Sequence, residues 1–406
     1  MNILLKISWR NIWRNPRRSW VLITSIAVGI FGYMGTSAFS RGFLVQMVES
    51  TINLHGGHVT IAGKGYHENP NIRLFIRNPE HVEQFLNEIN GVHYAPLVSF
   101  SGMINSTEKA AGVMIHGVSP EQESHITVIS QSIVEGNYLS ERENQILLGK
   151  GLAEKLNVQI GEKVVLMTSD LNKDISSGAY RISGLFETTS PDFDKTSVYL
   201  NQTAAQSLAG YTNQITAFNI KVDETPELES IIQTIKSNVQ GKKLEVLSWG
   251  DRNRLLVLAL ELYDYSVIII VVILFVAIAF SIANSFLMVI YERIHELGIM
   301  MANGVFPRKI RFMLYIEAFF ITLLGSGFGY GISVAVFGYL SRVGLDLSAF
   351  AAGIGKFGVG SILYPKIVAM DFILGLVLIN LIVFLSVLWP SIKASRFEVA
   401  DAIRFD

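Results

Sequence analysis

Four long apolar segments constrain this sequence more than any other feature. They cover residues 19–40, 266–291, 312–340 and 370–390, and only the third and fourth contain a charged side chain. A helix of roughly 20 apolar residues crosses the hydrocarbon core of a bilayer. The chain is 50% hydrophobic and 17% charged, which is too apolar for a typical soluble protein. The sequence therefore predicts an integral membrane protein with four transmembrane α-helices.

Basic residues flank these segments unevenly. They concentrate before the first segment, between the second and third, and after the fourth: Lys6, Arg10, Arg14, Arg17, Arg18, Arg293, Arg308, Lys309, Arg311, Lys393, Arg396 and Arg404. Because positive loops stay in the cytoplasm, we expect both termini there, together with residues 292–311 and the tail 391–406. The large segment 41–265 and the short loop 341–369 are then extracytoplasmic, and the chain is a multi-pass protein of the cytoplasmic membrane, which in an organism with two membranes means the periplasm and the inner membrane.

Residues 1–18 predict a cytoplasmic interfacial helix. Leu5, Trp9 and Ile12 recur on one face at helical spacing, and Lys6 and Arg10 lie on another. Apolar bulk against lipid with cations toward head groups suits a helix that lies on the membrane. A basic topology signal without further function explains the same residues.

The segment 41–265 alternates strand-like runs with short helical runs, separated by glycine-containing turns such as Asn90-Gly91. This alternation of strand-like and helical runs predicts an α+β domain. Apolar helical stripes continue past the first span and precede the second, so we expect the domain to be carried on helical stalks. The stalks either pack against each other or a partner subunit, or they offer a surface to an amphipathic cargo.

Several classes of function are disfavoured by what the sequence contains. The net charge is −1, so no basic face for nucleic acid is expected. There is no cysteine and no P-loop, which disfavours thiolate metal sites and ATP binding by that motif. His55-Gly56-Gly57-His58 is typical of a turn entering a strand rather than a metal site. We expect no catalytic residues and no metal.

The segment 292–311 predicts a short cytoplasmic helix that could dock on a partner. Glu292 and Glu296 are one turn apart and should share a face. Asn303-Gly304 can end the helix, and Ile299, Met300 and Met301 should be exposed. An ordinary connecting helix is the alternative. Glu317, near the start of the third span, should reach the membrane interface or pair with Arg311 or Lys309.

Five stretches in order along the chain resemble the MacB/LolC–LolE/FtsX superfamily of ABC permeases. They are Trp9–Arg18, Leu147–Val164, Glu292–Gly304, Glu317 and Trp389–Arg404. The layout of one span, a large outer domain and three further spans is also that of the family. Val399, where a proline is common, and Asn303, at a usually apolar position, depart from the pattern. Ile182–Leu200 and Trp249–Glu261 are most similar to the lipoprotein-releasing permeases.

The resemblance implies a permease subunit that is not itself an enzyme. A partner ATPase would bind ATP and Mg, while this chain would bind no cofactor and would help to extract lipoproteins from the inner membrane toward the outer membrane. The implied ATPase-coupling residues are Glu292, Arg293, Glu296, Leu297, Gly298 and Met301. The implied acyl-chain contacts are Phe39, Phe43, Met47, Leu256, Leu260 and Tyr263.

The resemblance also implies the other partners. These are cytosolic ABC ATPase subunits, a second permease copy or paralogue, lipoprotein cargo, a periplasmic carrier and membrane lipid. Two alternatives keep the same layout: an efflux or peptide-export permease of the MacB type, and a mechanotransmitting signal protein like FtsX.

Overall fold

The computed structural model describes residues 2–140, 142–223, 228–239, 243–355 and 358–394. The chain divides into two compact units. The helical unit comprises Met1–Leu44, Leu260–Asp346 and Ile362–Asp406, and the sheet unit comprises Val45–Ala259 and Leu347–Ser361.

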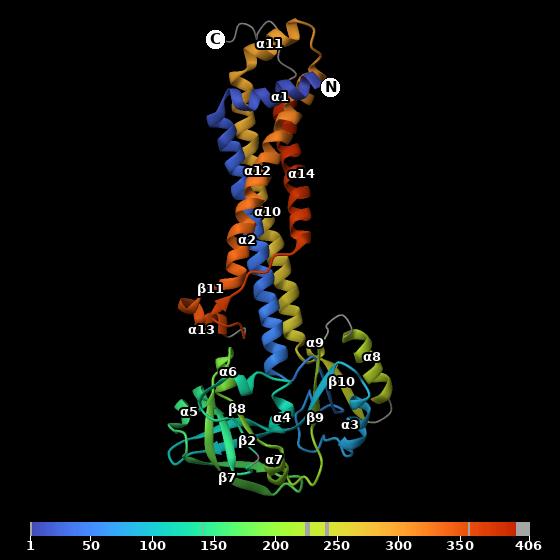
Figure 1. The fold of residues 1–406 in the computed structure, drawn as a ribbon, viewed down its shortest axis with the longest axis vertical. Helices are drawn as coiled ribbons and strands as arrows, with labels where there is room; N and C mark the ends of the chain where they lie inside the picture. Colours follow the sequence, from blue (N-terminus) through green and yellow to red (C-terminus); the bar gives the residue numbers. More distant parts are fainter. Residues whose placement is uncertain (1, 141, 224–227, 240–242, 356–357, 395–406) are drawn as a thin grey trace. The chain divides into compact units, whose positions relative to one another are not determined.

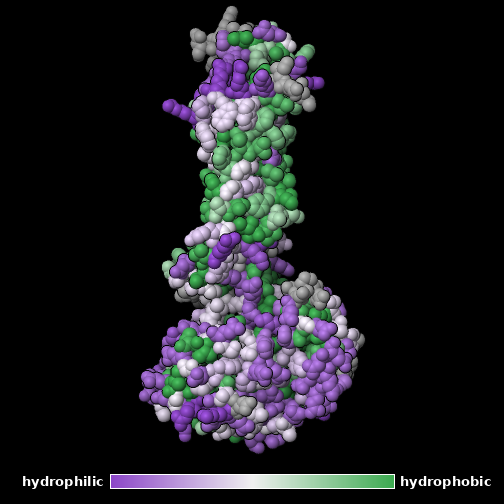
Figure 2. Space-filling view, viewed as in Figure 1, coloured by the Kyte–Doolittle hydropathy of each residue, from purple (hydrophilic) through white to green (hydrophobic). Residues whose placement is uncertain are grey.

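The helical unit is built on long apolar helices (Figure 1). They are α2 (Pro16–Leu54), α10 (Arg254–Glu292), α12 (Pro307–Val343) and α14 (Ala369–Ala394), and each has the length and hydropathy of a membrane span. Figure 2 shows the broad hydrophobic band that their side chains form. The expectation of four membrane helices is confirmed. At 1.5 Å per residue, the 39 residues of α2 and of α10 span about 58 Å, well beyond the roughly 30 Å hydrocarbon core.

Two short helices complete the helical unit. The amphipathic α1 (Asn2–Arg14) packs across α12, where Ser8 Oγ donates to the carbonyl of Met313 at 3.2 Å. Its Ile12 is fully buried, whereas Leu5 and Trp9 are exposed. Part of the apolar face of α1 therefore packs against the rest of the chain, and part remains exposed. The second short helix, α11 (Ile294–Ala302), joins α10 to α12.

Glycines in α12 allow close contact with α2. A Cβ at Gly325 would lie 2.8 Å from the Cβ of Ile26, and one at Gly329 would lie 2.9 Å from the carbonyl oxygen of Ala27. Gly327 and Gly331 point to open space. Four glycines alternate along this helix, but only Gly325 and Gly329 lie on the face that packs against α2, where small residues let the helices approach closely.

The segment 341–369 contains more structure than the predicted loop. It includes β11 (Leu345–Asp346) paired with β12 (Ile362–Leu363), the turn η3 (Ser348–Phe350) and α13 (Ala351–Ile354). These elements are too short to produce a periodic sequence signal.

The sheet unit contains a mixed ten-stranded sheet in the order β10-β1-β9-β2-β3-β8-β5-β7-β4, with β6 pairing β2 and β7. The strands are β1 (Val59–Gly63), β2 (Val92–Asn105), β3 (Ala110–Val118), β4 (Ile133–Gly136), β5 (Gln145–Gly149), β6 (Lys163–Ser169), β7 (Ile175–Phe186), β8 (Ser197–Asn201), β9 (Ala217–Val222) and β10 (Leu244–Ser248). The β3–β8 and β5–β7 pairs are parallel and the others are antiparallel.

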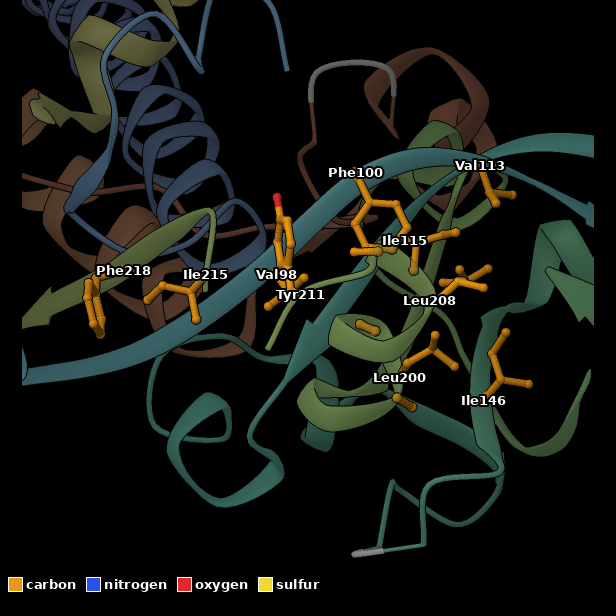
Figure 3. Close-up of a cluster of buried hydrophobic side chains, with 14 of the residues drawn as sticks. Val98, Phe100, Val113, Ile115, Ile146, Leu200, Leu208, Tyr211, Ile215 and Phe218 are labelled. Atoms are coloured by element: carbon orange, nitrogen blue, oxygen red, sulfur yellow. The ribbon is translucent and has the colours of Figure 1, made fainter. Parts of the chain in front are cut away.

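Helices accompany this sheet, which confirms the α+β class. They are α3 (Pro79–Asn87), α4 (Pro120–Glu123), α5 (Lys150–Leu156), α6 (Pro191–Asp194), α7 (Gln202–Ala209), α8 (Leu228–Val239) and α9 (Trp249–Arg252). Figure 3 shows the core, where Val98 and Phe100 of β2 gather with Ile115 of β3 and Leu208 of α7. All four side chains are buried, so this layer gives the sheet unit a core of its own.

His116 of β3 is a buried base in the sheet unit. Its Nδ1 lies 3.1 Å from Ser99 Oγ, and its ring lies 5.0 Å from that of Tyr199. Desolvation, and secondarily His55, lower the pKa of His116 to about 4. The imidazole is therefore neutral in the folded protein throughout the neutral and mildly acidic range.

We expect acidification from pH 7 to pH 5 to destabilise the sheet unit. The unfolded chain protonates His116 near pH 6.5, while the folded chain resists protonation until about pH 4, so stability is lost as the pH falls through that window. At 1.36 kcal/mol per pKa unit the loss between pH 7 and pH 5 is about 2 kcal/mol, and it approaches about 3 kcal/mol only near pH 4. Protease protection of the full chain in detergent, followed against temperature at each pH, measures it. His116→Gln should flatten the pH dependence, whereas His125→Gln, at an exposed position, should leave it intact; equal slopes for both variants would contradict this account.

Candidate functional site

A cluster of arginines and glutamates joins α1, α2, α10, α11 and α12. Helix α10 ends at Glu292, and Arg293, with φ −107° and ψ 12°, is the N-cap of α11. Because the helix is interrupted at Arg293, Glu292 and Glu296 lie on different helices and do not share one helical face as predicted. Asn303 is the C-cap of α11 as expected. Pro307 is the first residue of α12, where proline costs no hydrogen bond.

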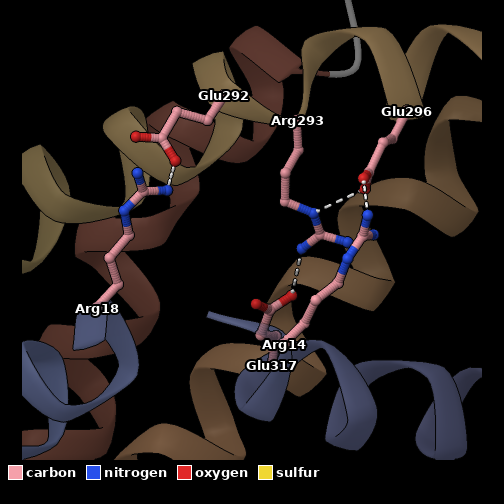
Figure 4. A network of polar contacts seen from close by, with 6 residues as sticks. All are labelled: Arg14, Arg18, Glu292, Arg293, Glu296 and Glu317. Carbon is pink, nitrogen blue, oxygen red and sulfur yellow. Dashed lines mark hydrogen bonds and ion pairs between the residues drawn. The ribbon is translucent and has the colours of Figure 1, made fainter. Parts of the chain in front are cut away.

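Arg293 joins two glutamates of this cluster (Figure 4). Its Nη1 donates to Glu317 Oε2 at 3.3 Å, and its Nε donates to Glu296 Oε2 at 3.3 Å. Only 14% of the Arg293 side chain and 6% of the Glu317 side chain are exposed. The prediction that Glu317 pairs with Arg311 or Lys309 is therefore wrong. Lys309 is about two turns away and Arg311 projects from a different side of α12.

The beginning of the chain supplies the other two arginines. Arg14, at the end of α1, contacts Glu296 with Nη2 2.6 Å from Oε1, and Arg18, in the first turn of α2, pairs with Glu292. We call these six residues the arginine–glutamate network: Arg14, Arg18, Glu292, Arg293, Glu296 and Glu317. The sequence singled out Arg14 and Arg18 for topology and as part of the Trp9–Arg18 stretch; no local pattern indicates that they reach α10 and α11.

The six predicted coupling residues differ in accessibility. Leu297 and Gly298 are buried, and Arg293 is largely buried, so these three contact the interior of the chain. Glu292, Glu296 and Met301 retain exposed or half-exposed side chains. Within the described residues, therefore, only part of the predicted set forms a surface that a partner can reach.

The apolar side of α11 also departs from expectation. Ile299 is 43% exposed, as predicted. Met300 and Met301, predicted to be exposed, are half-buried because they pack against a buried cluster containing Ile290 and Leu314. Helix α11 thus presents Ile299 and Glu296 rather than a row of three apolar side chains.

The predicted acyl-chain residues do not all meet. The rings of Phe43 and Tyr263 stack with centroids 5.7 Å apart. Phe39 instead packs edge-on against Phe337 of α12 at 5.8 Å. Met47 is buried, and Leu256 and Leu260 are half-buried.

Helix α10 exposes an apolar stripe within the helical unit. The stripe comprises Leu262, Ile269, Ile273, Val276 and Phe280, each about half exposed or more. Their spacing of seven, four, three and four residues keeps them on one helical face. An apolar face of this length must be covered by lipid, by a cargo or by another polypeptide.

No group of three or more His, Asp or Glu side chains that could hold a metal occurs among the described residues. His58, from the turn considered above, uses Nδ1 to accept the backbone N–H of Val222. Gly56 and Gly57 in that turn have φ of 94° and 76°, which are conformations that favour glycine.

Two family models match the chain. The MacB-like periplasmic core domain matches residues 19–238, more than half of the 406 residues. The FtsX-like permease C-terminal matches residues 267–399. The chain belongs to the MacB/FtsX-like permease family. The first match contains α2 and most of the sheet unit, and the second contains most of α10 together with α11, α12 and α14.

Individual relatives extend over most of this permease. It is 24% identical over 403 residues to "Lipoprotein-releasing system transmembrane protein LolC" of Neisseria meningitidis serogroup B, covering 95% of this chain and 94% of the relative. It is 22% identical over 336 residues to "Lipoprotein-releasing system transmembrane protein LolE" of Haemophilus influenzae, covering 76% and 77%. It is 23% identical over 421 residues to "Macrolide export ATP-binding/permease protein MacB" of Bdellovibrio bacteriovorus, covering 97% and 60%.

Family membership makes the chain an ABC-type permease, and its four apolar helices fit a multi-pass protein of the inner membrane. The arginine–glutamate network lies within the permease portion of the matched sequence, except for Arg14 and Arg18, which precede both matched ranges.

Proposed function

We propose that this permease is the transmembrane subunit of an ABC transporter that releases lipoproteins from the inner membrane toward the outer membrane. The observation that carries the proposal is the end-to-end similarity to a lipoprotein-releasing permease, over 95% of this chain and 94% of that relative. The chain has no P-loop, so ATP and Mg would be bound by a separate cytosolic ATPase.

The charges at one end of the helical unit support an orientation for this machine. The network gathers the end of α1, the start of α2, the end of α10 and the start of α12. Arg308, Lys309 and Arg311 follow at the start of α12. Basic residues concentrate on the cytoplasmic side of membrane proteins, so both termini are cytoplasmic and the sheet unit is periplasmic, where a carrier could receive the cargo.

The coupling surface in this proposal is α11 together with the last residue of α10. Glu292, Glu296 and exposed Ile299 would contact the ATPase, while Arg293, Leu297 and Gly298 hold α11 against α10 and α12. The buried Arg293–Glu317 pair ties α11 to the first turns of α12. A displacement imposed on α11 would therefore move the long helices as rigid bodies.

Acyl chains would enter beside α2 and α10. Phe43 and Tyr263 form an aromatic pair on that route, and the exposed stripe of α10 is apolar enough to face a lipid tail or a second permease. Each CH₂ leaving the bilayer costs about 0.8 kcal/mol, so extraction requires a compensating apolar surface together with ATP hydrolysis.

We expect Phe43→Asp to abolish release while leaving the transporter assembled. A charge on an apolar route costs about 3 kcal/mol, which slows the step about 100-fold. Inner-membrane vesicles containing the permease and its ATPase, charged with a triacylated lipoprotein, measure release; co-purification of the ATPase measures assembly. Phe43→Leu keeps an apolar side chain and should retain release. Normal release by Phe43→Asp would remove these residues from the acyl route.

A second candidate function is export of a soluble compound or peptide. It is favoured by the match of the MacB-like core domain and by the MacB relative that aligns with 97% of this chain. Mass spectrometry of the purified assembly separates the candidates. Triacylated lipoproteins together with an ATPase support release. An ATPase with an adaptor or a cell-wall hydrolase, and no acylated protein, supports export or mechanical signalling of the FtsX kind.

A further inference from the structure

An apolar groove of about 440 Å³ runs along the helical unit between α1, α12 and α14. The side chains that form most of its wall are Leu5, Phe312, Tyr315, Ile316, Phe319 and Phe384. A volume of this size is typical of small-molecule sites. The groove therefore has the dimensions and the surface of a site for an apolar chain.

Aromatic contacts fix the walls of the groove. Tyr315 of α12 stacks on Phe384 of α14 at 4.8 Å, and Trp9 of α1 meets Phe320 of α12 edge-on at 5.3 Å. These contacts hold the two neighbouring helices against α12. The groove is thus part of the packed structure of the helical unit rather than a gap between loose helices.

One end of the groove is positively charged, because Arg308 lies on the same face of α12 as the aromatic side chains of the wall. Arg308, Phe312, Tyr315 and Phe319 are spaced by four, three and four residues along α12, so they lie on one face. Arg308 is exposed, and Arg311, one turn further along, is half-buried. A cation therefore stands where the apolar wall ends.

These two arginines lack protein partners in the part of the chain that the structure describes. Neither Arg308 nor Arg311 takes part in an ion pair there, and Arg311 Nε is buried without a hydrogen-bond acceptor. In contrast, the nearby Arg293, Arg14 and Arg18 each contact a glutamate. The cations at the start of α12 are thus available to an external anion.

We propose that this groove binds one anionic phospholipid of the surrounding membrane. An acyl chain lies along Phe312, Tyr315 and Phe319, and the phosphate contacts the guanidinium groups of Arg308 and Arg311. Guanidinium groups match phosphate oxygens in geometry and charge. Basic sites between membrane helices select lipids by their head groups. The inference concerns a resident lipid and does not depend on which cargo the permease moves.

The test uses the full chain in nanodiscs of phosphatidylcholine, with or without one-third phosphatidylglycerol. We expect phosphatidylglycerol to raise the melting temperature of the unaltered chain, and native mass spectrometry to detect one retained phosphatidylglycerol. The double variant Arg308→Gln/Arg311→Gln should lose the increase and bind phosphatidylglycerol about 30-fold more weakly, because each cation near the head groups contributes roughly a fivefold factor.

Arg342→Gln is the matched control. Arg342 is an exposed cation in the last turn of the same helix, and its replacement should leave the phosphatidylglycerol effect unchanged. Leu5→Trp, which fills the groove but leaves both arginines, should also weaken lipid retention.

Three results would overturn the proposal. Equal destabilisation of the double variant in both lipid mixtures would mean that the arginines serve an acidic group of the protein. A change in oligomeric state would mean that a second copy occupies the groove. Equal effects of the double variant and of Arg342→Gln would reduce the lipid effect to overall charge.

Discussion

Replacing Arg293 with methionine should destabilise the helical unit by about 3–5 kcal/mol. The substitution removes the partner of Glu317, whose side chain is 6% exposed, and leaves a carboxylate in an apolar environment. Removing one member of a buried ion pair has this magnitude, since the remaining charge loses its compensation. The measurement is the melting temperature of the full chain in detergent, together with the fraction that remains monodisperse after heating.

Two controls separate burial from charge. Arg14→Gln removes a contact to Glu296 from a side chain that is 64% exposed, and exposed pairs contribute less than about 1 kcal/mol. The double variant Arg293→Met/Glu317→Leu removes both buried charges and should recover most of the lost stability. Equal losses for Arg293→Met and Arg14→Gln, or no recovery in the double variant, would show that Arg293 and Glu317 do not stabilise each other.

The consequence of this pair for coupling follows from its position. Arg293 is the residue at which α10 ends and α11 begins, and Glu317 is buried in α12. We expect Arg293→Met to lower ATP-driven transport more than it lowers ATP hydrolysis by the partner, because α11 would then move without moving α12. In the double variant the connection stays broken even though stability returns. Restored transport in that variant would therefore assign Arg293 a purely structural role.

The sequence predicted the parts of this fold that depend on composition and period. A membrane helix is recognisable as a long apolar run, so the four helices were predicted, although α2 and α10 extend more than ten residues beyond the predicted spans. The mixture of strands and short helices in residues 41–265 was predicted because apolar side chains alternate or recur with a fixed period. Long apolar runs and apolar periodicity are both local features of the sequence, and the structure contains the elements that they indicate.

The candidate site could be predicted only in part because its geometry is not local. Glu296 and Glu292 were recognised as important acids, yet their partners Arg14 and Arg18 are more than 270 positions away in the chain. The helix is interrupted at Arg293, and Leu297 in the helix that follows is buried. Such pairings depend on how helices pack, which spacing along one helix does not specify.

Gly329 offers the second large effect, and Gly329→Val should separate α2 from α12. A Cβ at Gly329 would lie 2.9 Å from the carbonyl oxygen of Ala27 and 3.1 Å from its Cα. Both are backbone atoms, which cannot rotate away as a side-chain tip can. Relief requires one helix to shift relative to the other, and we expect a loss of about 3 kcal/mol or more, at the upper end of overpacking costs.

The chain supplies a matched control two residues further along the same helix. At Gly331 an added Cβ would have no neighbour within 4 Å, so Gly331→Val changes the same intrinsic helix preference without a clash. The difference in melting temperature between the two variants therefore isolates the contact between α2 and α12. Because small residues let membrane helices approach closely and gain dispersion contacts, Gly329→Ala should fall between Gly329→Val and the unaltered chain. If Gly329→Val melts at the same temperature as Gly331→Val, the close contact at Ala27 does not hold these helices together.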